Sequence, residues 1–354
     1  MSAYRAPNRW VGAFSCATGV ALLVTGCGGG SGAGAPSSTD RLSLTAQGAC
    51  EAGNKEGSVN YVSRTDPEVF AKEVAPFEKA HPGIKVKYTS MKPADVTQRV
   101  VTEVQARRAL SVDATTTDLA SADPLFIQKL VRDVDYQKLG IPQALILNHN
   151  GITTFRVFRD ALGVAYNPKL SQESSLPRTW DELVDPKWSN KVVVDPRGIY
   201  LGVLAVAWGE PKTVAWFGKF NETDKPLVIN GTTDSIAKVV SGEALLSTSA
   251  TASAVVEQQK AGAPVAIHYL DVVSSQDKYG VLLKGAQHPN AAACFLSWWG
   301  GAEGQAQQLK YEYKGNTDVP DGVPATAKLA FIVKPADQDV VTKATEEISK
   351  ILAP

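Results

Sequence analysis

The regular alternation of strand-like and helix-like segments along most of the chain is the strongest constraint on the fold. Residues 59–62 form a short apolar run, typical of a buried strand, and residues 84–88 alternate in polarity, typical of a half-exposed strand. Between them, Phe70, Val74 and Phe77 recur at spacings of four and three residues and predict the apolar face of a helix. This alternation, without a short-period repeat, predicts an α/β protein with largely parallel sheets.

Composition sets the class of protein and excludes one class of partner. The chain has 354 residues, of which 44% are hydrophobic and 20% charged, enough for the core of a globular protein of about two domains. Lysine plus arginine and aspartate plus glutamate both number 36, so the formal net charge is zero. Such a chain has no broad electrostatic attraction for phosphates, and nucleic acid is not an expected partner.

The N-terminus has the pattern of an export signal. Arg5 and Arg9 precede an apolar run over residues 11–24, which at 14 residues is too short to cross comfortably a bilayer core of about 30 Å. The run ends in Val-Thr-Gly followed by Cys27, a pattern that resembles a bacterial lipobox, in which a peptidase cleaves before the cysteine and its thiol carries lipid. The alternative is an ordinary signal peptide with a chance cysteine.

The lipobox interpretation sets the N-terminal boundaries. Residues 1–26 are then a lipoprotein signal peptide, and residues 27–52 are a flexible tether anchored by lipid at Cys27. Residues 28–39 are almost all glycine, serine, alanine and proline, a composition that cannot bury enough surface to order itself. The protein is therefore expected to be exported and held at the outer face of the cell membrane, or at its periplasmic side.

Besides the lipidated residue, processing leaves two cysteines, Cys50 and Cys294. Two thiols in an exported protein invite a disulfide. The alternative is two unpaired core residues, because sequence gives no distance between them.

The sequence lacks the common signatures of catalysis and of metal binding. There is no G-x-S-x-G elbow, no phosphate-binding G-K-[ST] loop and no H-E-x-x-H pair. The four histidines, His81, His149, His268 and His288, are far apart, and no pair has the spacing of helical metal ligands. We therefore expect neither an enzyme, nor a metal site, nor a cofactor.

Small polar clusters recur where predicted strands end or helices begin. They are Ser63, Arg64 and Thr65; Ser90; Thr116, Thr117 and Asp118; Arg197 and Gly198; Thr232 and Thr233; and Ser247, Thr248 and Ser249. In open α/β sheets ligands bind outside the carboxyl ends of the strands, and helix N-termini there suit anions. Each cluster alone could be a cap or turn, but their recurrence favours a lined cleft.

Several short motifs together carry a family resemblance. They are Val59-Asn60-Tyr61, His81-Pro82-Gly83-Ile84-Lys85-Val86, Tyr166-Asn167-Pro168-Lys169-Leu170, Thr179-Trp180-Asp181-Glu182-Leu183, Ser241-Gly242-Glu243-Ala244 and His288-Pro289-Asn290-Ala291-Ala292. In this order, over about residues 55–330, they resemble the ferric-ion type of extracellular solute-binding proteins. These proteins serve ATP-driven (ABC) importers.

The resemblance implies a periplasmic-binding-protein fold of two α/β lobes, similar to type II, with a ligand cleft between them that closes by hinge motion. Lobe 1 would comprise residues 53–160 and 275–318, and lobe 2 would comprise residues 161–274 and 319–354. The partners implied are a small-molecule ligand and an ABC permease in the membrane, and family members are usually monomers.

The iron ligands of the family are mostly missing. Iron-binding members use a histidine after the first strand, a carboxylate after the third and an adjacent pair of tyrosines. Here Thr65 stands at the histidine position, Asp118 at the carboxylate, and Ser249 and Ala250 at the tyrosine pair. An alcohol and a methyl group do not replace phenolates as ligands of a hard trivalent ion, so free ferric iron is not the expected cargo.

The places where family members cradle an anion match better. Arg197, Gly198 and Ile199 match one, and Thr232 and Thr233 match the other. Arg197 would add a positive fork suited to carboxylate or phosphate, the alternative being a solvent-exposed arginine.

The function predicted is a lipid-anchored receptor that delivers a small solute to an ABC permease. The solute would be an anionic organic molecule such as a phosphonate or carboxylate, or chelated iron. The alternatives are a sensor lipoprotein for a membrane signalling partner, a binder of free ferric ion, and an exported enzyme in which Asp118 is the only obvious base.

Overall fold

The computed structural model describes residues 42–43, 45–316, 322–332 and 335–353. The predicted signal peptide, the lipidation site Cys27 and the predicted tether as far as residue 41 lie outside these residues. Within the described residues, no helix is both long and apolar enough to span a bilayer.

The strands are β1 Ser58–Ser63, β2 Lys85–Ser90, β3 Ala114–Thr117, β4 Ile146–His149, β5 Ile152–Tyr166, β6 Val192–Val194, β7 Leu227–Val228, β8 Leu246–Thr251, β9 Ala266–His268, β10 Val272–Leu282 and β11 Lys328–Ala330. The α-helices are α1 Ala46–Glu56, α2 Pro67–Ala80, α3 Pro93–Gln105, α4 Leu119–Ile127, α5 Trp180–Leu183, α6 Ala205–Trp208, α7 Glu210–Asp224, α8 Thr232–Val240, α9 Ala252–Lys260, α10 Pro289–Gly300, α11 Ala302–Glu312 and α12 Pro335–Ile351. Short 3-10 turns are η2 Gln143–Leu145, η3 Glu173–Ser175, η4 Pro186–Trp188 and η5 Gly202–Leu204.

The predicted α/β alternation is confirmed, but the sheet is mixed rather than largely parallel. Its strand order is β2-β1-β3-β10-β5-β8-β6-β7. β1 is parallel to β2 and β3, and β6 is parallel to β7 and β8, whereas β5 and β10 are antiparallel to each other and to their other main-sheet neighbours, β8 and β3. The antiparallel pairing of β5 and β10 has a topological cause, because a strand that leaves one lobe and a strand that returns to it run in opposite directions.

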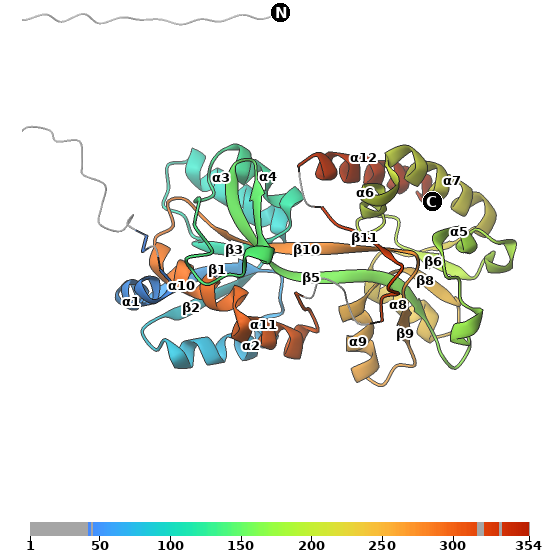
Figure 1. The fold of residues 1–354 in the computed structure, drawn as a ribbon, viewed down its shortest axis with the longest axis horizontal. Coiled ribbons are helices and arrows are strands. Elements are labelled where there is room, and N and C mark those ends of the chain that lie inside the picture. Colours follow the sequence, from blue (N-terminus) through green and yellow to red (C-terminus); the bar gives the residue numbers. More distant parts are fainter. Residues whose placement is uncertain (1–41, 44, 317–321, 333–334, 354) are drawn as a thin grey trace, which may run out of the picture. The chain divides into compact units, whose positions relative to one another are not determined.

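β5 and β10 connect two groups of elements, which we name the first and the second lobe (Figure 1). β5 pairs with β4 and β10 as far as Ala161, and with β8 and β9 from Leu162 onward. At the crossing, Arg159 of β5 lies opposite Asp277 of β10, and its guanidinium donates to both carboxylate oxygens, Nε at 2.9 Å and Nη2 at 2.7 Å. Both side chains are buried, so this pair fixes the register where the chain passes between lobes.

The first lobe has its main core between the sheet and helices α2, α10 and α1. Val59 and Tyr61 of β1 pack with Phe70 and Phe77 of α2 and Phe295 of α10, all of them buried. The predicted face of α2, with Phe70, Val74 and Phe77, is therefore confirmed, and Pro76 lies inside the helix without ending it.

The second lobe is closed by the C-terminal helix. Val341 and Ile348 of α12 belong to the same core as Trp180 and Phe217. α12 approaches η5 so closely that a Cβ on Gly202 would lie 2.0 Å from the hydroxyl of Thr345. The C-terminal segment thus packs against this lobe.

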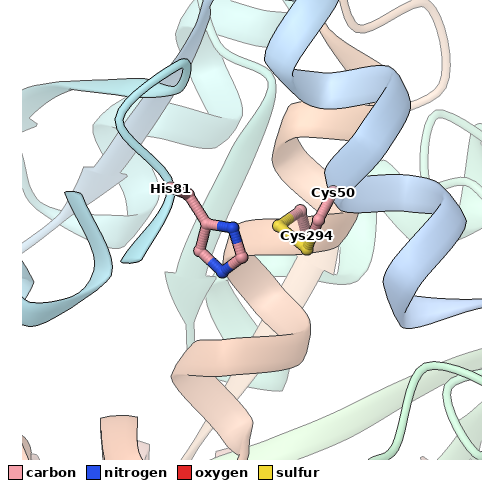
Figure 2. A group of neighbouring side chains, drawn as sticks. All are labelled: Cys50, His81 and Cys294. Atoms are coloured by element: carbon pink, nitrogen blue, oxygen red, sulfur yellow. A yellow bond between two sulfur atoms is a disulfide. The ribbon is translucent and has the colours of Figure 1, made fainter. Parts of the chain in front are cut away.

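A disulfide fixes the N-terminal helix to the first lobe. α1 is capped by the side chain of Thr45, and Cys50 in its middle forms a disulfide with Cys294 of α10, 244 residues away (Figure 2). Glu56 at its end accepts the backbone N–H groups of Asn290 and Ala291. Because helix α1 begins at Ala46, the predicted tether, which reached residue 52, has to be shortened.

Candidate functional site

A pocket of about 860 Å³ is lined by both lobes and by the strands that connect them. It brings together nine of the residues predicted from sequence: Ser63, Arg64, Thr65, Thr116, Asp118, Arg197, Ile199, Thr232 and Thr233. They come from the ends of β1 and β3, from the segment after β6 and from the start of α8. The pocket thus lies where the carboxyl ends of parallel strands from the two lobes meet, as expected for an open α/β fold.

Six of the predicted residues do not line this pocket: Ser90, Thr117, Gly198, Ser247, Thr248 and Ser249. Ser90 is exposed at the end of β2, and the hydroxyl of Thr117 donates to the carbonyl of Asp118. Gly198 has a φ of +63°, and a Cβ there would meet Ile348 of α12 at 3.0 Å. It therefore shapes a turn against α12.

The cluster from Ser247 to Ser249 was predicted to follow a strand, and this is wrong. These residues lie inside β8 and are buried. The Oγ of Ser249 accepts the backbone N–H of Asp195, and the Oγ of Ser247 accepts the N–H of Ser249. The strand ends at Thr251, and Thr251 and Ser253 line the pocket instead.

Sequence reasoning also missed one wall made by the C-terminal helix. Gln338, Val341, Thr342, Thr345 and Glu346 of α12 line the pocket. They recur at spacings of three and four residues, so the helical periodicity of this stripe is the signal that could have identified it.

Arg197 is paired with a carboxylate of its own loop. Its Nε donates to both oxygens of Asp195 at 3.0 Å, and its Nη2 donates to Oδ2. Asp195 also accepts the backbone N–H groups of Arg197 and Gly231. The guanidinium of Arg197, predicted to bind an anion, therefore lines the pocket with its charge largely compensated by Asp195. Through Asp195 it helps to order the loop before α8.

Two helices point uncapped first turns at the pocket. Neither α3, which begins after Lys92, nor α8, which begins after Gly231, has a side chain capping its N-terminus among the described residues. Lys92 and Ala94 of the first helix start and Thr232 and Thr233 of the second line the pocket. Their N–H groups and the helix dipoles favour a bound anion.

Arg64 and Lys92 add positive charge to the same lining. Both side chains are exposed, and neither forms an ion pair within the described residues. Solvent screens both charges, and together with the two helix starts they make the lining of this pocket favourable for an anion.

Asp118 is occupied by structural contacts. Its carboxylate accepts the N–H of Ser121 at 2.8 Å, capping α4, and lies 2.9 Å from the Nζ of Lys278. Burial opposes its ionisation, but the ammonium of Lys278 and the N–H of Ser121 hold its pKa below the usual value. Asp118 is thus an ionised partner of Lys278, which argues against its use as a general base.

The described residues offer one group of histidine, cysteine, aspartate and glutamate side chains close enough together to hold a metal ion. It is Cys50, His81 and Cys294, whose ligand atoms lie within 4.8 Å of one another. Both sulfurs form the disulfide, and the imidazole of His81 lies beside it (Figure 2). The group is not part of the pocket and, while oxidised, has no thiolate to give a metal.

Residues 72–334 match a family of bacterial extracellular solute-binding proteins. Among solved structures, the iron-bound HitA of Pseudomonas aeruginosa is similar with a TM-score of 0.67 and 17% identity, covering 83% of this chain and 99% of that one. A Trichodesmium protein (IdiA, FutA) in complex with iron and citrate gives 0.67 and 18%, covering 83% and 99%. The substrate-binding protein of an Agrobacterium tumefaciens ABC transporter gives 0.64 and 17%, covering 82% and 95%.

At these identities the solved structures show a shared fold. No curated protein sequence is detectably similar to this chain.

Proposed function

Since this chain belongs to the bacterial extracellular solute-binding proteins, which are binding proteins and not enzymes, we propose that it is the solute receptor of an ABC importer. Its cargo is a small anionic organic molecule, such as a phosphonate or a carboxylate, or an anionic iron chelate. Its lipid anchor is at Cys27, and it acts as a monomer at the outer face of the membrane.

One observation supports an anionic cargo. Two uncapped helix starts and two basic side chains without an ion pair among the described residues line the same pocket. The basic side chains are Arg64 and Lys92. Helix starts recognise a compact anion through backbone N–H groups, and the side chains add charge. The hydroxyls of Thr232 and Thr233 supply further donors.

Iron in an anionic chelate is a second candidate, favoured by the neighbours solved with iron and with iron and citrate. Against free ferric ion stands the local chemistry. By the resemblance, Thr65 stands at the family's histidine position, and Asp118, which stands at its carboxylate position, is already paired with Lys278. A chelate brings its own oxygen ligands and would use the same anion-binding groups.

The first experiment is a thermal-shift titration of a soluble form that starts at residue 28 and retains every described residue. The panel contains phosphonates, phosphate, simple carboxylates, ferric citrate and free ferric ion. A ligand at about a hundred times its Kd adds roughly 2.7 kcal/mol to the free energy of unfolding, which is readily visible. A shift with free ferric ion alone would contradict the proposal.

Charge variants locate the binding site. Replacing Arg64 and Lys92 together by glutamine is expected to weaken anion binding at least tenfold. The matched control replaces Lys72 and Arg99, exposed lysine and arginine residues of α2 and α3 outside the pocket lining, and should leave affinity unchanged. Equal losses in both variants would indicate a general charge effect.

Anchoring and transport need separate tests. Cys27→Ser should move the protein from the membrane fraction to the soluble fraction in a cell that exports it. Loss of solute uptake on deletion of the protein supports the importer, whereas normal uptake with a lost transcriptional response supports the alternative of a sensor lipoprotein.

A further inference from the structure

One end of the pocket holds more carboxylic acids than basic groups. Glu312 at the end of α11 and Asp160 of β5 line the pocket there, and Glu73 of α2 interacts electrostatically with Glu312. The ammonium group that acts on these acids is that of Lys314, whose Nζ lies 2.9 Å from Oε1 of Glu312 and 4.9 Å from the ring centroid of Phe158.

Three of the carboxylate oxygens at this end lack a hydrogen-bond partner. They are both oxygens of Glu73 and Oε2 of Glu312, and no described residue donates to them. Glu73 is completely buried, at 0% exposure, and its carboxyl group interacts electrostatically with Glu312, Lys314 and the phenol of Tyr61. Buried carboxylate oxygens without partners are rare in folded proteins, so Oε2 of Glu312, a residue that lines the pocket, indicates a missing donor.

Asp160 is not one of these unpartnered acceptors, because its oxygens already accept the N–H and the hydroxyl of Ser253 at 3.2 and 2.6 Å. The open acceptor positions therefore belong to Glu312, which lines the pocket, and to Glu73.

Aromatic rings surround the same end. Tyr61, Phe158 and Trp299 line the pocket, and the rings of Tyr61 and Trp299 are 6.2 Å apart. Ring faces attract cations, and the ammonium of Lys314 already uses that of Phe158. The unpartnered oxygen of Glu312 and the aromatic lining together describe a site for an organic cation.

We propose that this end of the pocket binds a protonated amine of the solute, with Oε2 of Glu312 as its direct acceptor and Glu73 as the buried acid beside it. The inference rests on the proposed function and deepens it: the cargo carries an amine as well as an acidic group. The acidic group binds at the starts of α3 and α8, and the amine binds between Glu312 and the aromatic rings.

The proposal has a measurable consequence for protons. Burial, and then the charge of Glu312, raises the pKa of Glu73 to about 9, while Lys314 lowers it, so Glu73 is protonated at pH 7 before an amine binds. A second ammonium beside Glu312 favours the ionised form of Glu73. Binding of an amine is then expected to release up to one proton at pH 7.

The test uses calorimetric titrations at pH 7 with matched ligand pairs that differ only in the amine. One pair is O-phosphoethanolamine and ethyl phosphate. The others are ω-amino carboxylates of two to five carbons and the carboxylates of equal length. The amine member is expected to bind at least tenfold more tightly, and buffers of different ionisation enthalpy should reveal proton release with that member alone.

Two variants separate direct from indirect roles. Glu312→Gln should abolish the preference for the amine, while the amine-free member still binds. Glu73→Gln should abolish proton release. Glu68→Gln, an exposed glutamate on the same helix as Glu73, is the control and should change neither.

The outcomes distinguish this proposal from the proposed function. Equal affinity within each pair, with both members binding, overturns the amine site and leaves the anion receptor in place. If no member binds, the anion receptor fails, and the amine site is judged with propylamine and spermidine: a thermal shift that Glu312→Gln removes supports it, and no shift overturns it.

Discussion

At the scale of single residues, the structure separates residue types that look alike in sequence. Arg197 and Arg64 both follow predicted strands, yet the first is bound to Asp195 and the second forms no ion pair among the described residues. The presence of Arg197 in the pocket could be predicted from sequence, but its compensation could not, because that depends on a loop geometry that brings residues 195 and 197 together. The burial of Glu73 could not be predicted from the sequence, since one glutamate in an amphipathic helix is usually solvated.

The buried carboxyl of Glu73 predicts a pH dependence of stability. Its pKa is about 9 in the folded protein, raised by burial and by Glu312, against an ordinary value of 4.5 when unfolded. The folded state therefore binds the Glu73 proton more tightly than the unfolded state does. The contribution of this proton to the free energy of unfolding is fully present below about pH 4.5 and is lost as pH rises toward 9. Glu73→Gln should stabilise the protein by about 1–3 kcal/mol at pH 7.

The measurement is urea unfolding of wild type and variant at pH 5, 7 and 8.5. The difference in unfolding free energy between the two proteins should grow with pH, because only the wild type has the Glu73 carboxyl. The other titrating groups are common to both proteins and cancel in the subtraction. Glu68→Gln serves as the exposed control. A difference that stays constant over this range would show that Glu73 is ionised in the folded protein.

At the scale of elements, the strand–helix order was predictable and the ends of the elements were less so. β8 reads Leu-Ser-Thr-Ser-Ala-Thr, and its hydroxyls suggested a loop after two leucines. The hydroxyls can be buried because they form hydrogen bonds with neighbouring backbone groups. The sequence does not reveal these partners. Because β8 ends at Thr251, the polar residues of this segment that line the pocket are Thr251 and Ser253, and not Ser249.

The disulfide between α1 and α10 predicts a loss of stability when it is removed. It closes a loop of 244 residues in the unfolded chain, so its removal should cost about 2–5 kcal/mol. The double variant Cys50→Ala, Cys294→Ala should melt at a lower temperature than wild type, and a thiol reductant should lower the wild-type Tm without affecting the variant. Equal melting of the variant and the oxidised wild type would show that the bridge contributes no stability.

Packing of α12 against η5 predicts opposite effects at two glycines. Gly202→Ala places a methyl group 2.0 Å from the hydroxyl of Thr345 and 3.1 Å from its Cβ and N, so Thr345 has to shift and about 1–3 kcal/mol should be lost. Gly218→Ala, inside α7 with open space around it, should gain about 0.5–1 kcal/mol. Because α12 lines the pocket, Gly202→Ala should also weaken ligand binding, which calorimetry checks. A neutral Gly202→Ala would mean that α12 is loosely held.

At the scale of the whole molecule, two strands couple the lobes. β5 and β10 supply residues to both parts of the sheet, so unfolding of one lobe removes strand partners from the other. The resemblance seen in the sequence could predict this arrangement of lobes, but the spacing of residues could not reveal the ion pair at the crossing, because Arg159 and Asp277 are 118 residues apart.

That ion pair predicts cooperative unfolding and a large cost for its disruption. Asp277→Ala leaves the buried guanidinium of Arg159 without its main carboxylate, and breaking such a pair costs about 3–5 kcal/mol. The loss should appear as a shift of one transition, because both lobes depend on the crossing strands. Tryptophan fluorescence reports on the second lobe through Trp180 and Trp216 and on the first through Trp299, and far-ultraviolet circular dichroism reports on all elements. Coincident curves are expected in both proteins, whereas two separate transitions in wild type would show that each lobe is stable without the other.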